Sequence, residues 1–308
     1  MAKARALDKR RKSIRNIRKI TRTMELIARA KYKKAMDRAL AATAYTQRVT
    51  QVVARLAEAG LAVSHPLLEA HDKLEHAALL VLTANRGLCG GYNGGVIRIA
   101  TPRYQELKAS ASHLRLEVAG KRGITGLKYR NVKIDEAYLQ FNDQPKFEEV
   151  DPIATRLLND YSTGKLDRLD VAYTKFISTS KQMAVVETLL PLGSLGGDEA
   201  QAEKGAAKSG ASEDVATASD QTQYEFLPSA ESILQEVVPM SFKIRLFKCF
   251  LDAAVSEQIA RMVAMKSATE NASDMIKDLS MTYNRARQSQ ITGEIMEIIG
   301  GVEALKGT

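Results

Sequence analysis

The stretch from Phe242 to Gly300 constrains the fold more than any other part of the chain. It contains no proline, and its first glycine is Gly293. As one continuous helix it would extend roughly 85 Å, at about 1.5 Å per residue. A chain of this length packed as a globule would be only about 40 Å across. We therefore predict a helix that projects from its domain and needs a partner to cover its apolar side.

The N-terminal segment supplies a matching helix, which we predict over residues 4–59. It has no glycine before Gly60 and no proline before Pro66. Its apolar and small residues recur every seven positions, which is the period of a left-handed coiled coil. The first row is Ile14, Thr21, Ala28, Ala35, Ala42, Val49 and Leu56, and the second is Ile17, Met24, Tyr45, Val52 and Ala59, interrupted by Lys31 and Arg38.

The C-terminal helix carries two heptad rows of its own. The first is Leu251, Gln258, Met265, Ala272, Leu279 and Ala286, and the second is Ala254, Arg261, Ala268, Met275, Thr282, Ser289 and Met296. A stable dimeric zipper normally has more Leu and Ile at these positions. Two matched segments at opposite ends of one chain therefore favour an antiparallel pair within the chain. A coiled coil between two chains is the alternative.

Charge is concentrated at the N-terminus. The chain has a net charge of +9, yet residues 1–40 alone hold fifteen Lys and Arg residues against three acidic ones. This surplus indicates either a solvated helix face or a docking surface for an acidic partner, a nucleic acid or an anionic lipid. No apolar run reaches the length of a membrane span, and no signal-peptide pattern is present. Cys89 and Cys249 lie far apart and fit no disulfide framework, which favours a reducing compartment.

The middle of the chain has the pattern of a small α/β domain. All seven prolines fall between Pro66 and Pro239. Alternating strand and helix patterns predict a Rossmann-like layer of parallel strands. We expect strands at 77–83, 114–119, 169–177 and 185–190, and helices at 95–108 and 150–162. The predicted division is an N-terminal coiled-coil helix (1–60), a central α/β domain (61–193), a flexible loop (194–222) and a C-terminal segment with the long helix (223–308), whose capped start lies near Pro228.

The glycine-rich stretch after the first strand, residues 87–95, resembles a phosphate cradle only superficially. It lacks the Lys-Ser/Thr ending of a P-loop and the G-x-G-x-x-G spacing. We interpret it as a tight turn between a strand and a helix, with Cys89 as a small buried residue. The four histidines (His65, His71, His76 and His113) have no metal-ligand spacing and are expected at the surface. We predict no catalytic, cofactor or metal site.

Three segments of the chain resemble the γ subunit of F-type ATP synthase. They are IRNIRKITRTMELIARAKYKKA near the N-terminus, TANRGLCGGYN in the middle, and SEQIARMVAMKSATENASDMIKDLS with YNRARQSQITGEIMEIIGG at the C-terminus. The resemblance covers almost the whole chain apart from 194–221. It implies a central α/β domain and an antiparallel coiled coil that lies inside a ring of three α and three β subunits.

The resemblance also implies the function and the partners. The chain would be the central rotor shaft of F1, without catalytic activity of its own, coupling proton-driven rotation of the c-ring to conformational change in the β subunits. Its partners would be α, β, ε and the c-ring, with no nucleic acid, at the cytoplasmic face of the bacterial plasma membrane. The contact residues that the family motif implies are Met24, Lys31, Arg261, Arg287, Gln288, Glu294 and Glu297.

Two other classes of protein remain to be weighed. A basic coiled-coil protein that binds nucleic acid, or a scaffold, would fit the N-terminal charge, but the sequence has no base-reading motif or aromatic platform. An enzyme that uses the glycine-rich loop would need phosphate and ribose partners, which the sequence lacks. Binding to α and β subunits would discriminate the rotor from both alternatives.

Overall fold

The computed structural model describes residues 2–58, 66–69, 71, 73–141, 143–192 and 230–306. The predicted loop at 194–222 lies outside them. The chain forms two compact units, of which unit 1 is Met1–Lys31, Leu88–Gly90 and Gln258–Thr308, and unit 2 is Tyr32–Gly87 and Gly91–Glu257. Each unit is described by itself below.

The two long helices are α1 (Ala2–Glu58) and α6 (Ala230–Lys306). Helix α1 matches the prediction closely. Helix α6 is longer than the predicted Phe242–Gly300 helix, because it continues through Pro239 to a start near the expected cap. Val238 and Phe242 are fully buried on either side of the proline, so packing stabilises the helix across the missing N–H. Gly293 does not end the helix.

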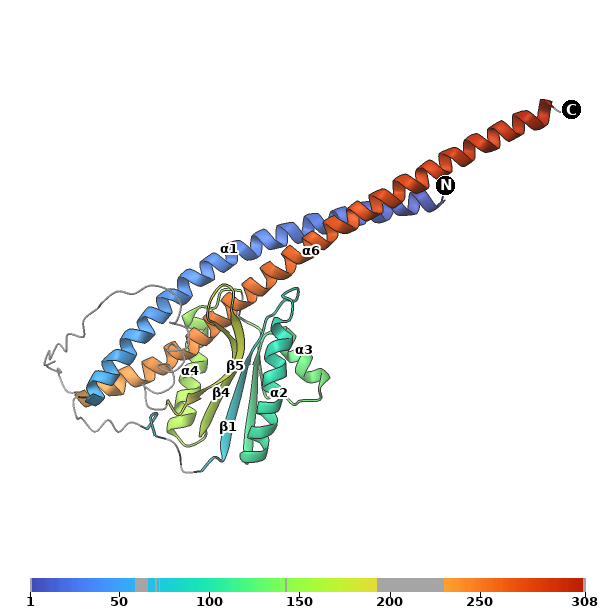
Figure 1. The fold of residues 1–308 in the computed structure, drawn as a ribbon. Helices are drawn as coiled ribbons and strands as arrows, with labels where there is room; N and C mark the ends of the chain where they lie inside the picture. Colours follow the sequence, from blue (N-terminus) through green and yellow to red (C-terminus); the bar gives the residue numbers. More distant parts are fainter. Residues whose placement is uncertain are drawn as a thin grey trace. The chain divides into compact units, whose positions relative to one another are not determined.

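Unit 2 is built on a five-stranded sheet in the order β3-β2-β1-β4-β5 (Figure 1). The strands are β1 (His76–Leu82), β2 (His113–Ala119), β3 (Glu136–Tyr138), β4 (Arg168–Phe176) and β5 (Gln182–Leu190). The first four pair in parallel, as predicted for the core of the layer. Strand β5 is antiparallel to β4, which differs from the expectation of parallel strands.

The described residues of unit 2 also form three shorter helices, namely α2 (Tyr92–Ser110), α3 (Lys121–Tyr129) and α4 (Phe147–Ser162). The predicted helices at 95–108 and 150–162 correspond to α2 and α4. Helix α3 was not predicted, because it is only nine residues long and contains two glycines, which lower helix propensity. The three-residue β3 was too short to recognise.

The sheet separates two apolar cores. On one face, Leu79 and Val81 of β1 pack with Val96 of α2 and Leu127 of α3. On the other face, the sheet packs against α4 and the first part of α6, as in Figure 1. Phe242, Leu246 and Phe250 supply the α6 side of this second core. The long C-terminal helix therefore begins as a structural element of the sheet unit.

Candidate functional site

In unit 1 the two long helices form an antiparallel pair. The Thr269 hydroxyl donates to Thr21 Oγ1 across the pair at 2.8 Å. The Arg11 guanidinium lies over the Tyr283 ring, 4.6 Å from its centroid. The residue numbers rise along one helix while their partners' numbers fall along the other, so the helices run in opposite directions. The predicted pairing within one chain is confirmed for this unit, and Figure 1 shows the two helices side by side.

The first predicted row of α1 forms the seam of the helix pair. Ala28 is fully buried, Ala35 is 3% exposed, and Thr21 is 9% exposed. Side chains this small allow the backbones of two helices to approach closely. The row therefore sets a close, low-volume contact rather than a Leu-rich zipper.

The second predicted row of α1 is contradicted at its first member, because Ile17 is 45% exposed. Met24 is half-buried, and Arg38, an expected interruption, is exposed. The side chains of Tyr45, Val52 and Ala59 lie outside the described residues. The helix instead buries Ala39 to 3% exposure and half-buries Glu25 and Tyr32, which lie four residues after members of the first row. Both choices keep a heptad period, so the sequence spacing alone could not select between them.

In α6 the first predicted row is buried over its first half. Leu251, Met265 and Ala272 are at most 5% exposed, and Gln258 is fully buried. Neither amide atom of Gln258 has a hydrogen-bond partner among the described residues. The second row is buried only at its start, because Met275 is 42% exposed. The seam of α6 therefore narrows toward the C-terminus.

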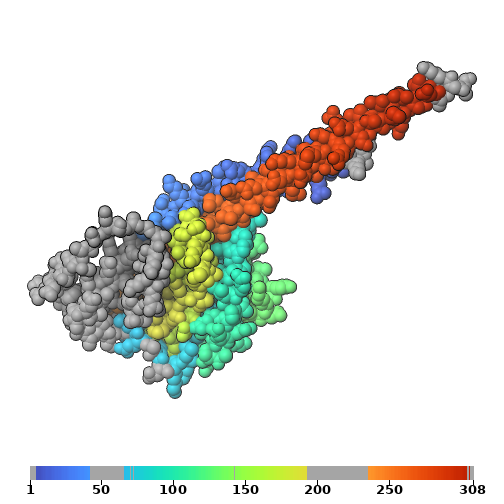
Figure 2. Space-filling view, viewed as in Figure 1, coloured from blue at the N-terminus to red at the C-terminus, as the bar shows by residue number. Residues whose placement is uncertain are grey.

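The C-terminal end of α6 presents an apolar stripe that the sequence reasoning missed. Figure 2 shows this end of unit 1, in red, extending past the N-terminal end of α1, in blue. Its exposed apolar residues recur at helical spacing on one side: Ile291, Ile295, Ile298, Ile299, Val302 and Leu305. The recurrence at three and four residues was visible in the sequence, and it predicts a helix face that another surface covers.

Basic residues cover much of the exposed surface of α1 in unit 1. Some are paired locally, since Arg22 donates to Glu25 at 2.9 Å and Arg11 donates to Asp8 at 2.6 Å. Hydrogen bonds from Lys12 and Arg11 hold the pKa of the Asp8 carboxyl below its usual value. Exposed pairs of this kind contribute little stability. The main effect of the many basic residues on α1 is a positive field along the helix, which orients an acidic partner.

The predicted contact residues fall into two environments. Met24 and Lys31 are half-buried, and Arg261 is 8% exposed. The remaining four, Arg287, Gln288, Glu294 and Glu297, are exposed along the C-terminal end of α6. Their contact with partner subunits stays a prediction.

A substitution in the seam tests the importance of its small residues. Ala28→Leu adds three carbon atoms at a fully buried position, so we expect it to destabilise unit 1 by about 1–3 kcal/mol. Ala30→Leu is the matched control, since Ala30 is exposed two residues away and its change should stay within about 0.5 kcal/mol. Thermal unfolding followed by circular dichroism at 222 nm compares the two variants. Equal melting temperatures would contradict a close-packed seam.

The glycine-rich loop is a tight turn whose polar groups serve the fold. Asn93 Oδ1 accepts from the backbone N–H of Ala84 at 2.9 Å, which joins the two ends of the turn. Leu88 and Gly90 have positive φ angles of 64° and 55°. Cys89 is 1% exposed, as predicted. The loop therefore has the geometry of a turn, and the side-chain amide oxygen of Asn93 already accepts a hydrogen bond within it.

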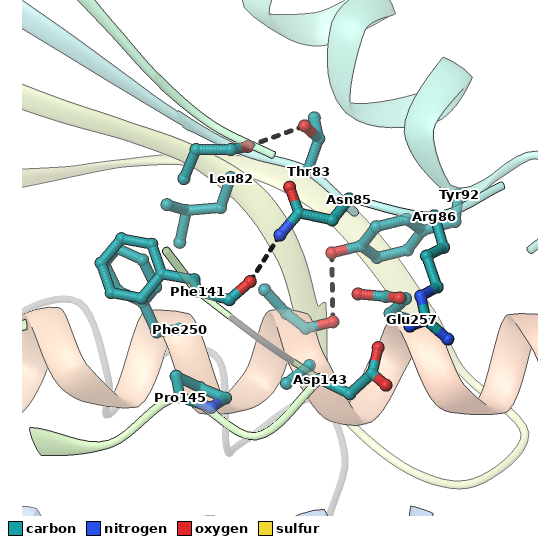
Figure 3. Close-up of a pocket in the computed structure, with 13 residues that line it drawn as sticks. Leu82, Thr83, Asn85, Arg86, Tyr92, Phe141, Asp143, Pro145, Phe250 and Glu257 are labelled. Atoms are coloured by element: carbon teal, nitrogen blue, oxygen red, sulfur yellow. Dashed lines mark hydrogen bonds between the residues drawn. The ribbon is translucent and has the colours of Figure 1, made fainter. Parts of the chain in front are cut away.

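A small cavity of about 80 Å³ lies at the carboxyl ends of β1 and β2, where ligands bind in many α/β proteins (Figure 3). Its polar groups hold the surrounding chain together. Asn85 donates to the Phe141 carbonyl at 2.6 Å and accepts from the Lys121 N–H at 3.0 Å. The Tyr92 hydroxyl donates to the Ala253 carbonyl at 3.1 Å. We therefore assign this cavity a structural role.

The histidines do not converge on a metal. His71 pairs with Asp167 at 2.6 Å, and His76 stacks on His113. His71 and His113 are exposed as predicted, whereas His76 is half-buried and His65 lies outside the described residues. Within the described ranges, no group of three or more His, Cys, Asp or Glu side chains could hold a metal ion. The described helices also include none that is long and apolar enough to cross a membrane.

Fold and surface together define a class of protein. In this class, a pair of long helices is joined to an α/β sheet, and the exposed surfaces of the helices are available for contact with partner proteins. The nucleic-acid-binding alternative gains no support from the comparisons that follow.

Comparisons with known proteins identify the family. A family model described as ATP synthase matches residues 3–305. The chain is 65% identical over 307 residues to the ATP synthase gamma chain of Rhodopirellula baltica, with 100% of both chains covered. It is 35% identical over 305 residues to the gamma chain of Leptospira biflexa, covering 99% of this chain and 100% of that one. The chain therefore belongs to the ATP synthase gamma chain family.

Solved structures support the same fold. A chain from the Euglena gracilis mitochondrial ATP synthase, in a structure of OSCP, F1 and c-ring, matches with a TM-score of 0.62 and 20% identity, covering 99% of this chain and 95% of that one. A second structure, of the rotor of the same enzyme, matches with a TM-score of 0.58 and 18% identity, covering 94% of this chain and 99% of the other. The predicted combination of long helices with a Rossmann-like domain is confirmed.

Proposed function

We propose that the chain is the central rotor shaft of the F1 part of a proton-translocating ATP synthase. The observation that carries this proposal is the 65% identity with a gamma chain over the full length of both proteins. The antiparallel helix pair supports it, because a stiff helical rod can transmit torque between its two ends. The proposed partners are the α and β subunits of F1, the ε subunit and the c-ring of Fo.

The mechanism follows from the unequal surface of unit 1. The α1 surface is basic, whereas the C-terminal end of α6 exposes an apolar stripe from Ile291 to Leu305. A shaft with different chemistry on its different sides contacts each surrounding β subunit differently. Because a ligand or partner shifts a conformational equilibrium only by differential contact, turning such a shaft would move each β subunit between states in sequence.

Individual residues have distinct roles in this proposal. Arg287, Gln288, Glu294 and Glu297 are exposed on α6 and are available to line a ring-facing surface. Met24 and Lys31 contribute from α1, where they are half-buried. Arg261 is 8% exposed, so we assign it to shaping the contact surface as well as to touching a partner.

The remaining parts of the proposal concern location and organisation. The chain would work at the cytoplasmic face of a bacterial plasma membrane, held there by the complex, and would have no catalytic activity or cofactor of its own. We propose the division into 1–60, 61–193, 194–222 and 223–308 as its functional domains. The two helical segments would form the shaft, and the sheet domain would face the membrane side.

Reconstitution tests this function. The tagged chain is co-expressed with α and β subunits and purified, and ATP hydrolysis is measured for the complex and for the isolated chain. We expect both α and β to be recovered with the chain, and hydrolysis by the complex alone. Failure to recover either subunit would overturn the proposal, as would ATP hydrolysis by the isolated chain at the rate of the complex.

A further inference from the structure

Within the part of the chain that the structure describes, strand β5 forms one edge of the sheet and pairs with β4. It is nine residues long, Gln182–Leu190. Among the described residues, no backbone hydrogen bond joins β5 to any segment other than β4. An edge strand exposes a row of N–H and C=O groups that can pair with another strand. The length of β5 makes this row long enough for specific pairing.

The hairpin identifies which backbone groups point outward. The Lys181 N–H donates to the Ser178 carbonyl at 3.1 Å, and the Lys181 carbonyl accepts from the Ser178 N–H at 3.0 Å, so both backbone groups of Lys181 point toward the other strand of the hairpin. Hydrogen-bonded and non-hydrogen-bonded pairs alternate along an antiparallel ladder. With the observed register, the residues whose backbone groups point away from β4 are Gln182, Ala184, Val186 and Thr188.

Strand β5 lacks most of the devices that protect sheet edges. It contains no Lys and no Pro, and its one charged residue, Glu187, pairs with Lys175 at 2.7 Å. The opposite edge strand, β3, has only three residues, and short edge strands resist further pairing. Among the described residues, one edge of the sheet is thus protected by shortness, whereas β5 presents a longer, largely apolar edge, on which Met183 is 50% exposed.

We propose that the outer edge of β5 pairs with an extended strand of a partner protein. The partner segment would hydrogen-bond to the outward groups of Ala184, Val186 and Thr188, which is β-strand addition. Val185 packs against one core of unit 2, and Val186 packs against the other. The added strand would therefore meet apolar side chains on both sheet faces, so apolar residues at successive positions fit it best.

The proposal commits to a partner protein and not to a second copy of this chain. This choice rests on the proposed function, in which one copy serves as a single shaft. The exposed β3 edge is too short to receive the β5 of another copy. A pair of β5 strands around a two-fold axis is the competing arrangement, and the experiment below detects it.

Amide hydrogen exchange, read at single residues, tests the pairing in the parent chain. Exchange along 182–190 is compared between the free chain and the membrane-extracted complete complex. We expect the amides of Ala184, Val186 and Thr188 to slow by about tenfold or more on assembly. The amides of Val185 and Glu187, which face β4, should change much less. Equal exchange of the outward amides in both samples would overturn the proposal.

The other outcomes are also decisive. A complex that assembles and hydrolyses ATP while β5 stays unprotected overturns this inference and leaves the proposed function standing. A chain that recovers no partner subunits overturns both. Outward amides that are already protected in the free chain, together with a dimer in light scattering, show β5 pairing between copies and overturn the proposal.

A proline variant provides a second test. Ala184→Pro removes one outward N–H, and proline is tolerated on the free side of an edge strand. Ala184→Ser keeps the N–H and serves as the matched control. In the complex, the proline variant should lose most of the protection at Val186 and Thr188, whereas the serine variant should keep it. Parent-like protection in a folded proline variant would contradict strand addition, and the parent exchange data remain decisive if that variant fails to fold.

Discussion

Gly120→Ala is expected to prevent stable folding of the sheet unit. Gly120 follows β2 with a φ angle of +97°, a backbone conformation that residues with a side chain rarely adopt. A Cβ added there would lie 2.1 Å from the Thr83 carbonyl oxygen. The Thr83 N–H and the Gly120 N–H both take part in backbone hydrogen bonds that join the strand ends, so neither segment can move away. We expect Gly120→Ala to lower the free energy of unfolding by at least about 3 kcal/mol.

Gly164→Ala is the matched control for this substitution. Gly164 also has a positive φ, +70°, but an added Cβ would meet no atom within 4 Å. Gly164→Ala should therefore lower the free energy of unfolding by only about 1 kcal/mol, because backbone strain is its only cost. Urea unfolding followed by near-ultraviolet circular dichroism of the tyrosines compares the two variants. Similar unfolding midpoints for Gly120→Ala and the parent would refute the close approach to Thr83.

Asp252→Asn is expected to stabilise the protein at neutral pH. Asp252 is 4% exposed on α6. Burial raises the pKa of its carboxyl to about 6, with a further contribution from Glu187 and opposition from Lys248 and Lys175. Because the folded state holds this proton more tightly than the unfolded state, stability falls as pH rises from about 4 to about 6.

Asparagine has no ionised form, so the stability of the Asp252→Asn variant does not fall as the pH rises through this range. We expect its unfolding free energy to exceed that of the parent by up to about 3 kcal/mol at pH 8. The difference should shrink as the pH falls from about 6 to about 4 and disappear near pH 2 to 3, where the parent carboxyl is protonated in both states. Asp278→Asn, which makes the same chemical change at an exposed position of the same helix, is the matched control. A constant difference between pH 4 and pH 8 would contradict the assignment to Asp252 ionisation.

The sequence was sufficient to predict the two long helices and their antiparallel pairing. Both follow from local properties, because proline and glycine are sparse and small residues such as Thr21, Ala28 and Ala35 recur every seven positions. The second row of α1 was misplaced at Ile17, which is exposed, and the buried Ala39 was not predicted. Which flank a seam includes depends on the partner helix, and this information is not local.

The sheet was predicted only in part, because some of its elements have a local sequence pattern and others do not. Strands β1, β2 and β4 are apolar runs that the core requires, whereas β3 and α3 are too short to have a period. The antiparallel direction of β5 depends on the five-residue connection after Phe176, which is too short for a parallel crossover and is consistent with a hairpin. That signal was available in the sequence and was overlooked.

The contact residues were the least predictable part of the site. Family motifs drew attention to Arg287 and Glu297, and the structure shows that both are exposed. The spacing of the apolar stripe from Ile291 to Leu305 was visible in the sequence, and the structure shows that the stripe is exposed. Contacts with other subunits depend on surfaces that this chain does not contain, so its own sequence and fold cannot specify them.

A rotation measurement tests the central claim most directly. Cys89 and Cys249 are 1% and 3% exposed, so a cysteine introduced by Tyr129→Cys, at a position 88% exposed, is the selective site for attaching a bead. The assembled complex is fixed to a surface through its β subunits, and ATP is added. We predict that the bead turns stepwise in one direction while ATP is hydrolysed. Continued hydrolysis with a bead that does not turn would contradict the rotor function.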